Sequence, residues 1–181
     1  MITFKFVLEC LYLMLPAYFA NMTPVFVKGY KFLDIPLDAN KHFRGKPILG
    51  RNKTWRGLIF AVIAAGFVAL FQFFIYPAIP DFGLIYYSDF RIVLVIALLS
   101  GFGDIFGDAI ESFFKRQLNI QPGKAWIPFD QIDFVVGAVA LMLIVFNPGW
   151  EALIIILVIS PILHLIINFI GYKLKIRKNA I

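Results

Sequence analysis

Long uncharged apolar runs dominate this sequence of 181 residues, of which 61% are hydrophobic and 15% are charged. A soluble domain of this size cannot bury so much apolar surface. A helix of about 20 apolar residues can cross a membrane, because its backbone hydrogen bonds are satisfied internally. The runs are too long for the strands of a membrane barrel and do not alternate. The sequence therefore predicts an all-α integral membrane protein, with one domain over residues 1–181.

We expect a bundle of about five transmembrane helices. They cover residues 2–27, 57–76, 90–114, 127–146 and 150–172. The first helix contains Pro16 and Pro24 and should bend near them. The turn Asn147-Pro148-Gly149 separates the last two helices, since this combination rarely continues a helix. The two sizeable loops are residues 28–56 and 115–126.

The basic residues orient the predicted bundle, because 15 of the 17 lysines and arginines follow spans one, three and five. These are Lys28, Lys31, Lys41, Arg44, Lys46, Arg51, Lys53, Arg56, Lys115, Arg116, Lys124, Lys173, Lys175, Arg177 and Lys178. Cytoplasmic loops carry an excess of Lys and Arg. We therefore expect a multi-pass protein of the cell membrane with its N-terminus outside and its C-terminus and both loops in the cytoplasm. The net charge of +6 reflects this topology and not nucleic-acid binding, since no basic domain is present.

Five of the 11 acidic residues lie between positions 104 and 133, at the cytoplasmic ends of spans three and four. Asp104 and Asp108 are one helical turn apart and share a face that Glu111 continues. Ionisable side chains inside a membrane are costly and are by default functional. Pairing with a loop lysine would explain Glu111 equally well. The preference of acids for helix N-termini would explain either Asp130 or Asp133, but not both.

Carboxylates on two neighbouring spans are suited to Mg²⁺, which prefers oxygen ligands and shares its shell with phosphate oxygens. Neither a His/Cys cluster nor a phosphate-binding P-loop occurs in the sequence, which argues against zinc and against a P-loop protein. The predicted metal ligands and catalytic residues are Asp104, Asp108, Asp130 and Asp133. The sequence does not define which of these four carboxylates binds the ion directly.

A basic segment, Gly-Arg-Asn-Lys-Thr-Trp-Arg-Gly at residues 50–57, precedes span two. Helix N-termini bind anions, and Arg and Lys add charge-assisted bonds to phosphate. Ordinary flanking charge, with Thr54 as a helix cap, would explain this segment equally well. The predicted phosphate-binding residues are Asn52, Lys53, Thr54, Arg56, Lys115, Arg116 and Lys124.

Span five carries Ser160, His164 and Asn168 four residues apart, so they share one face. His164, Asn168 and Asn21 are the candidates for contact with a lipid headgroup. Packing against a neighbouring helix is the alternative for His164, and a helix-end cap before Pro24 is the alternative for Asn21.

Two motifs now suggest a family. The segment E-S-F-F-K-R, followed after a loop by P-F-D-Q-I-D, resembles the signature of CTP-dependent phosphatidate cytidylyltransferases. The matched residues are Ser112, Lys115, Arg116, Asp130 and Asp133, and the resemblance adds Ser112 to the phosphate-binding candidates. N-K-T-W-R-G resembles the K-K-T-W-E-G segment of that family. The chain has K-A-W-I-P-F where the bacterial enzymes have P-x-H-G-G. Its size, topology and P-A-Y-x-A-N-M-x-P run are similar to the archaeal branch, the CDP-archaeol synthases.

The resemblance implies transfer of CMP from CTP to the ether-lipid phosphate 2,3-bis-O-geranylgeranylglycerol 1-phosphate, giving CDP-archaeol and pyrophosphate. It also implies Mg²⁺ as cofactor, with CTP, the lipid phosphate and membrane lipids as partners. A CTP-dependent lipid kinase of the dolichol or phytol type would use similar motifs but transfer the γ-phosphoryl group. An ion or solute transporter would place its acids near the midplane of two pseudo-symmetric halves. A structural membrane subunit is the remaining alternative. The sequence does not define lipid saturation, the number of metal ions or the oligomeric state.

Overall fold

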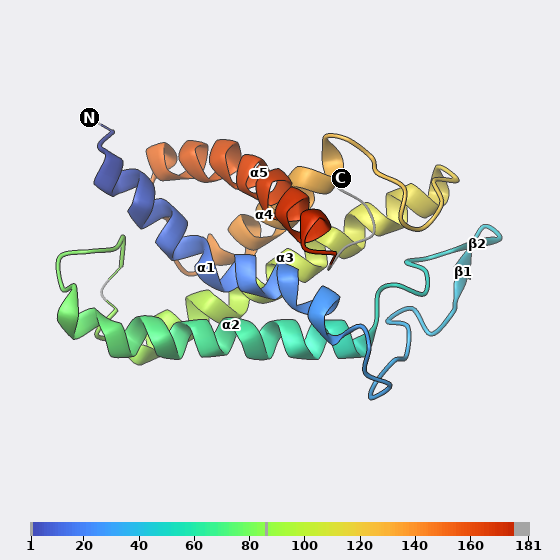
Figure 1. The fold of residues 1–181 in the computed structure, drawn as a ribbon, viewed down its shortest axis with the longest axis horizontal. Coiled ribbons are helices and arrows are strands. Elements are labelled where there is room, and N and C mark those ends of the chain that lie inside the picture. Colours follow the sequence, from blue (N-terminus) through green and yellow to red (C-terminus); the bar gives the residue numbers. More distant parts are fainter. Residues whose placement is uncertain (1, 86, 176–181) are drawn as a thin grey trace.

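The computed structural model describes residues 2–85 and 87–175, and five α-helices make up most of this part of the chain (Figure 1). They are α1 (Phe4–Val27), α2 (Trp55–Ile75), α3 (Phe90–Gln117), α4 (Phe129–Met142) and α5 (Trp150–Lys173). The predicted all-α fold is confirmed, and the bounds of α1, α2, α3 and α5 lie within three residues of those expected. Arg177 and Lys178 lie outside the described residues.

Four of these helices, α1, α2, α3 and α5, are long and apolar enough to cross a membrane. Helix α4 has 14 residues, and at 1.5 Å per residue it is about 21 Å long, which is less than the ~30 Å hydrocarbon core. The predicted fourth span, 127–146, was therefore too long at both ends. The helix begins after Pro128, and residues 143–149 lead without helix to the start of α5. Within that segment the Asn147 side chain accepts a hydrogen bond from the Gly149 N–H (2.9 Å), which confirms the predicted turn.

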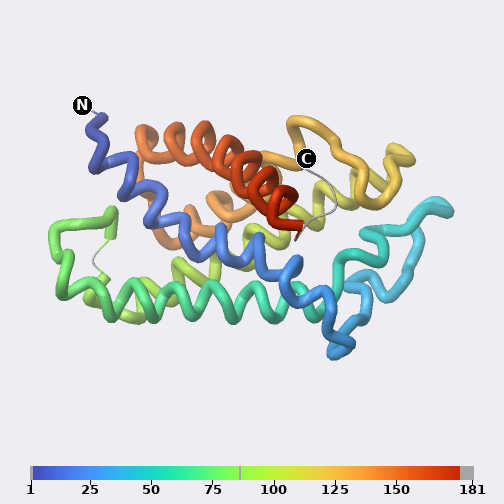
Figure 2. The backbone as a smooth tube through the Cα atoms, in the orientation of Figure 1, coloured from blue at the N-terminus to red at the C-terminus, as the bar shows by residue number. Residues whose placement is uncertain are grey.

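Helix α3 lies at the centre of the bundle and packs against α1, α2 and α4. Its 28 residues make it about 42 Å long, so it exceeds the hydrocarbon core by about two turns. Its C-terminal part extends toward the end of the molecule that carries β1 and β2 (Figures 1 and 2). The polar second half of α3 is therefore placed at that end.

The first loop contains a hairpin that the sequence does not predict. Strand β1 (His42–Phe43) pairs antiparallel with β2 (Lys46–Pro47). The Lys46 ammonium donates to the carbonyl of Gln117 (2.5 Å), so the hairpin is attached to the end of α3. The hairpin therefore lies beside the C-terminal end of α3, at one end of the molecule (Figure 1).

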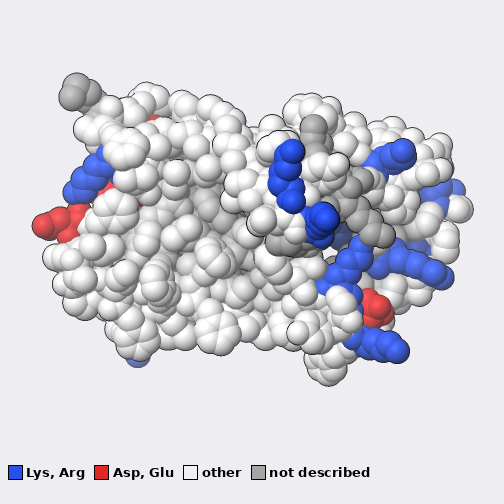
Figure 3. Space-filling view, viewed as in Figure 1, with Lys and Arg blue, Asp and Glu red and all other residues white. Residues whose placement is uncertain are grey.

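Basic side chains gather at the end of the molecule that carries the hairpin, and a wide band without charged residues follows on the face shown in Figure 3. Lys5 lies at the N-terminal end, where its ammonium donates to the Asp81 carbonyl (2.6 Å). The described residues therefore show the one-sided distribution of basic charge that the sequence predicts.

Asp38 holds the first loop in shape. Its carboxylate accepts hydrogen bonds from three backbone N–H groups, those of Asn40 (3.0 Å), Leu49 (2.8 Å) and Gly50 (3.0 Å). Burial disfavours the charged form, but these donors outweigh that effect and lower the pKa of Asp38 below its ordinary value. The carboxylate thus joins the two ends of the segment 38–50.

Replacing Asp38 with Ala should release this loop without unfolding the bundle. Hydrogen exchange of the Leu49 and Gly50 amides should become at least about tenfold faster, because hydrogen bonds to a charged acceptor contribute about 1.5–3 kcal/mol. Since the pKa is lowered, protection in the unaltered protein should persist down to the ordinary carboxyl pKa of about 4 and be lost at lower pH. Lys41→Ala, at an exposed position of the same loop, is the control. Equal exchange in Asp38→Ala and the unaltered protein would contradict this account.

Candidate active site

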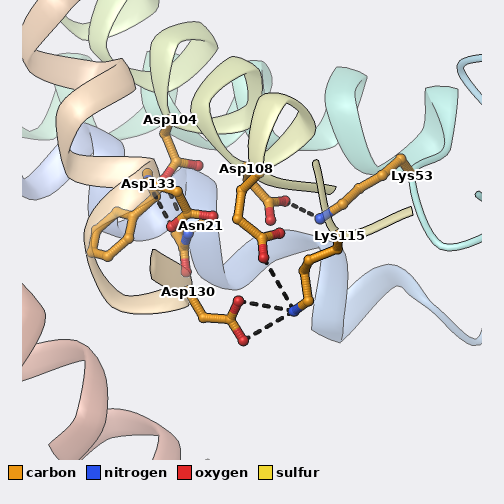
Figure 4. Close-up of polar contacts among 9 residues, drawn as sticks. Asn21, Lys53, Asp104, Asp108, Lys115, Asp130 and Asp133 are labelled. Carbon is orange, nitrogen blue, oxygen red and sulfur yellow. Dashed lines mark hydrogen bonds and ion pairs between the residues drawn. The ribbon is translucent and has the colours of Figure 1, made fainter. Parts of the chain in front are cut away.

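Helices α3 and α4 bring the five predicted acids to one place near the hairpin end of the bundle. Asp104, Asp108 and Glu111 come from α3, and Asp130 and Asp133 come from α4 (Figure 4). Asp108, Glu111 and Asp133 each offer one oxygen, and these oxygens lie within 4.8 Å of one another. Oxygen ligands lie about 2.0–2.1 Å from Mg²⁺, so small side-chain rotations would place all three on one ion. We call these three residues the acidic triad.

Asp104 lies beside the triad and is fully buried. The Asn21 amide of α1 donates to its Oδ1 at 3.0 Å (Figure 4). Its Oδ2 has no hydrogen-bond partner among the described residues. A buried carboxylate oxygen without a donor is costly. A further donor or a cation bound at this oxygen would stabilise the site.

Two lysines contact the acids directly. The Lys53 ammonium, from the segment before α2, bonds the Asp108 carboxylate. Burial lowers the pKa of Lys53, but the charge and hydrogen bond of Asp108, together with the charges of Asp133 and Glu111, outweigh burial and raise that pKa overall, so Lys53 stays cationic. The Lys115 ammonium bridges Glu111 (3.2 Å) and Asp130 (2.8 and 3.0 Å).

The site has an excess of negative charge. Five carboxylates face two lysine ammonium groups in the contacts described above. Such an imbalance is costly next to hydrocarbon, where water screens charges poorly. The donors offered are hard oxygen atoms, which fit a hard divalent cation and not a thiolate-preferring metal. The acidic cluster can therefore hold a divalent cation.

Arg116 follows Lys115 on α3 but serves a different part of the site. It lines a cavity of about 600 Å³ between the first loop and residues 119–122, together with His42, Lys46, Arg51 and Asn119. Its side chain is buried, and its Nε has no hydrogen-bond partner among the described residues. The volume lies in the range of small-molecule sites, about 300–1,000 Å³. His42 and Asn119 were not predicted as site residues, because only the folded hairpin places them beside Arg116.

Thr54 and Arg56 hold the start of α2. The Thr54 hydroxyl accepts from the Gly57 N–H (3.2 Å), so Thr54 is the helix cap that the sequence offered as an alternative. The Arg56 guanidinium pairs with Asp34 (2.9 Å) and donates to the Tyr30 carbonyl. Both side chains thus have structural partners, and a role of either in phosphate binding stays a prediction.

Three other predicted phosphate-binding residues surround the site at different depths. Asn52 and Lys124 are exposed on the two loops, whereas Ser112 is buried on α3 next to Glu111. Among the described residues, no hydrogen bond or ion pair joins these three side chains to the acids, so their roles stay predictions.

The polar face of α5 turns toward α1 and α4. The Ser160 hydroxyl bonds the Tyr18 hydroxyl of α1 (2.6 Å). The His164 ring meets Phe134, the residue after Asp133, edge-on with a centroid distance of 4.9 Å. Asn168 is buried one turn further along. His164 and Asn168 thus lie on the side of α5 that covers α4, whereas Asn21 contacts Asp104.

Comparisons with known proteins agree with this geometry. A family model described as CarS-like CDP-archaeol synthase matches residues 3–180. The CDP-archaeol synthase of Thermococcus onnurineus (strain NA1) is 37% identical over 161 residues, which cover 88% of each chain. That of Methanocaldococcus jannaschii is 35% identical over 179 residues, covering 96% of this chain and 97% of the relative. A solved structure, described as an intramembrane enzyme for archaeal membrane lipids biosynthesis, is 28% identical with a TM-score of 0.73, covering 90% of this chain and 94% of that chain.

The four apolar helices and the likeness to that solved structure define a multi-pass intramembrane enzyme, and the matching family model and relatives place it in the nucleotidyltransferase class. The match extends over nearly the whole length of the chain and of its relatives. The chain belongs to the CDP-archaeol synthase family.

Replacing Asn21 with Leu should destabilise the protein, because the buried Asp104 carboxylate would lose its hydrogen-bond donor. The expected loss is about 1–3 kcal/mol in the free energy of unfolding, measured by denaturation in detergent micelles. Asn21→Leu combined with Asp104→Leu should recover most of it, since replacing both partners with apolar groups leaves no unpaired polar atom. Thr23→Ala on the same helix, whose hydroxyl bonds only the Phe19 carbonyl in the contacts described, is the control. An Asn21→Leu variant as stable as the unaltered protein would refute the stabilising role of the hydrogen bond from Asn21 to Asp104.

Proposed function

We propose that this protein makes CDP-archaeol by transferring CMP from CTP to 2,3-bis-O-geranylgeranylglycerol 1-phosphate at the cytoplasmic face of the cell membrane, with Mg²⁺ as cofactor. Family membership supports the reaction. The observation that carries the mechanism is the acidic triad, whose oxygens lie within 4.8 Å of one another beside Lys53 and Lys115. The basic side chains at that end of the bundle support the cytoplasmic orientation.

The acids divide into three roles in this proposal. Asp108, Glu111 and Asp133 would hold Mg²⁺ directly. Asp104, behind them and attached to Asn21, would complete the shell or bind one of its water ligands. Asp130 would position Lys115, which it holds through both carboxylate oxygens. Glu111 thus replaces Asp130 in the metal-binding set that the sequence favoured.

Once the metal neutralises the acids, Lys53 would exchange Asp108, and Lys115 would exchange Glu111, for CTP phosphates, while Asp130 would keep Lys115 in position. Arg116 and Arg51 would contact the rest of the nucleotide in the neighbouring cavity. Consecutive Cα atoms are about 3.8 Å apart, so Lys115 and Arg116 link the two parts of the site within one residue. Further candidates for phosphate binding are Asn52, Thr54, Arg56, Ser112 and Lys124.

The reaction does not require a strong general base from the protein. The lipid phosphate monoester is already an anionic nucleophile, and its oxygen would attack the α-phosphorus of CTP. The new P–O bond forms as the bond to the β-phosphate oxygen breaks, and pyrophosphate leaves with the electron pair. Bringing two polyanions together is the main barrier, so positioning and charge neutralisation supply most of the catalysis. Mg²⁺, when bound, would neutralise charge on the phosphates and on the leaving pyrophosphate.

The lipid headgroup must reach the acidic face of α3. An apolar groove of about 530 Å³, lined by Phe102, Phe106 and Ile110, lies on the opposite face of this helix and would not bring the phosphate to the triad. His164 and Asn168 lie on the α5 face that covers α4, so they remain our candidates for the headgroup. Asn21 would affect the headgroup site through its hydrogen bond with Asp104.

The position of label in the products separates this reaction from the alternatives. CTP labelled on its α-phosphate should label the lipid, and CTP labelled on its γ-phosphate should label pyrophosphate. A lipid kinase would instead carry the γ label into the lipid and release CDP, and a transporter would form neither product. With inverted membrane vesicles, added CTP should be used without permeabilisation, because the site faces the cytoplasm. Activity only in right-side-out vesicles would refute the orientation.

Neutral substitutions in the triad test the metal-binding set. Asp108→Asn, Glu111→Gln and Asp133→Asn should each lower kcat by about 10²-fold or more, and raise the Mg²⁺ concentration for half-maximal rate. Asp81→Asn, at an exposed position near the opposite end of the bundle, is the matched control and should leave both unchanged. An unchanged Mg²⁺ dependence in Glu111→Gln would remove Glu111 from the set and restore Asp130 as the better candidate.

A further inference from the structure

Helices α3 and α4 touch backbone to backbone at three glycines, Gly103 and Gly107 of α3 and Gly137 of α4. A Cβ atom added to Gly107 would lie 2.2 Å from the Asp133 carbonyl oxygen and 3.2 Å from the Gly137 Cα. A Cβ added to Gly137 would lie 2.1 Å from the Gly103 oxygen and 2.8 Å from the Gly107 Cα. No side chain fits at either position unless the two helices separate.

This close contact lies at the level of the acidic triad. Gly107 immediately precedes Asp108, and the backbone atom that it touches belongs to Asp133 itself. Asp108 and Glu111 come from one helix and Asp133 from the other, so the distance between the two helices sets the distance between the ligands. The fully buried Asp104 Oδ2, without a partner among the described residues, lies at the same interface.

We propose that Gly107, together with Gly137, is a positioning residue of the divalent-cation site: it admits α4 close enough for the Asp133 carboxylate to share an ion with Asp108 and Glu111. The inference rests on the proposed metal-binding role of the triad. Gly107 touches neither substrate nor metal and acts through Asp133.

The size of the expected effect follows from the geometry. Relieving the contact at Gly107 requires the backbones to separate by roughly 1 Å, which is large compared with the tolerance of Mg²⁺ for ligand distances of about 2.0–2.1 Å. Misplacements of this size in a preorganised site can cost as much as ~10²-fold. An alanine at this position should therefore weaken cation binding at least about tenfold, even where the bundle still folds.

Gly101 provides a matched control on the same helix. A Cβ added there would lie 2.5 Å from the Ala65 Cβ of α2, so Gly101→Ala also forces two helices apart. That contact involves α2 and none of the acids. Gly101→Ala should therefore lower thermal stability as Gly107→Ala does, without the same effect on cation binding.

The test is direct binding of Mn²⁺, an oxygen-preferring stand-in for Mg²⁺, to the purified full chain in nanodiscs without CTP, followed by electron paramagnetic resonance. Gly107→Ala should raise the Kd for Mn²⁺ at least about tenfold, and Gly101→Ala should leave it within twofold. An equal rise in both variants, or an unchanged Kd in Gly107→Ala, would overturn the proposal. If the unaltered protein bound no Mn²⁺, the proposed metal site itself would fail, which is a distinguishable result.

A change in carboxylate length provides a second readout that loss of stability alone would not produce. Adding Asp133→Glu to Gly107→Ala should restore part of the Mn²⁺ affinity, because the longer side chain spans the widened gap. Asp133→Glu alone should weaken binding, since the glycine contact prevents α4 from retreating to accommodate the extra methylene. This single variant introduces no backbone clash, so it can be measured even if Gly107→Ala does not fold. Full Mn²⁺ affinity in Asp133→Glu would overturn the proposal.

Discussion

The pairing of buried carboxylates with cations at the edge of the hydrocarbon layer is the constraint on which the rest of this structure depends. Acids on α3 are costly there unless another element covers them with positive charge or donors. Lys53 and Lys115 reach them from the first loop and from α3 itself, and Asn21 reaches Asp104 from α1. A divalent cation can neutralise the negative charge that remains unbalanced. The same cation can in turn bind a polyphosphate, which is the kind of substrate that this family uses.

Much of the fold follows from the sequence because membrane spans depend on local composition. Apolar runs of sufficient length place α1, α2, α3 and α5 within a few residues. Helix α4 is different, since apolar residues beyond Met142 continue the run although the helix does not. The hairpin was not predicted either, because its position depends on distant contacts such as that of Lys46 with the end of α3.

The same distinction applies to the site. Helical spacing predicts that Asp104, Asp108 and Glu111 share a face, the start of the expected fourth span brings Asp130 and Asp133 to the same end, and the family motif adds Ser112. Which acids meet depends on how far α4 is shifted and rotated against α3, and single-sequence spacing holds no information about that. The structure therefore groups Glu111 with Asp108 and Asp133, and leaves Asp130 paired with Lys115. The direction of Arg116, toward the loop cavity, likewise depends on the folded first loop.

Helix α3 carries Asp104 at a buried level and Lys115 nearly three turns later on one continuous rod. The spacing of residues along one continuous helix does not change when the bilayer thickens or thins, because tilting of the whole helix accommodates the mismatch in length. In the proposed reaction, the distance between the acidic residues and Lys115 is thus fixed by the helix and does not depend on the thickness of the bilayer. Such an enzyme can keep its reaction geometry while the membrane that it helps to build changes in thickness.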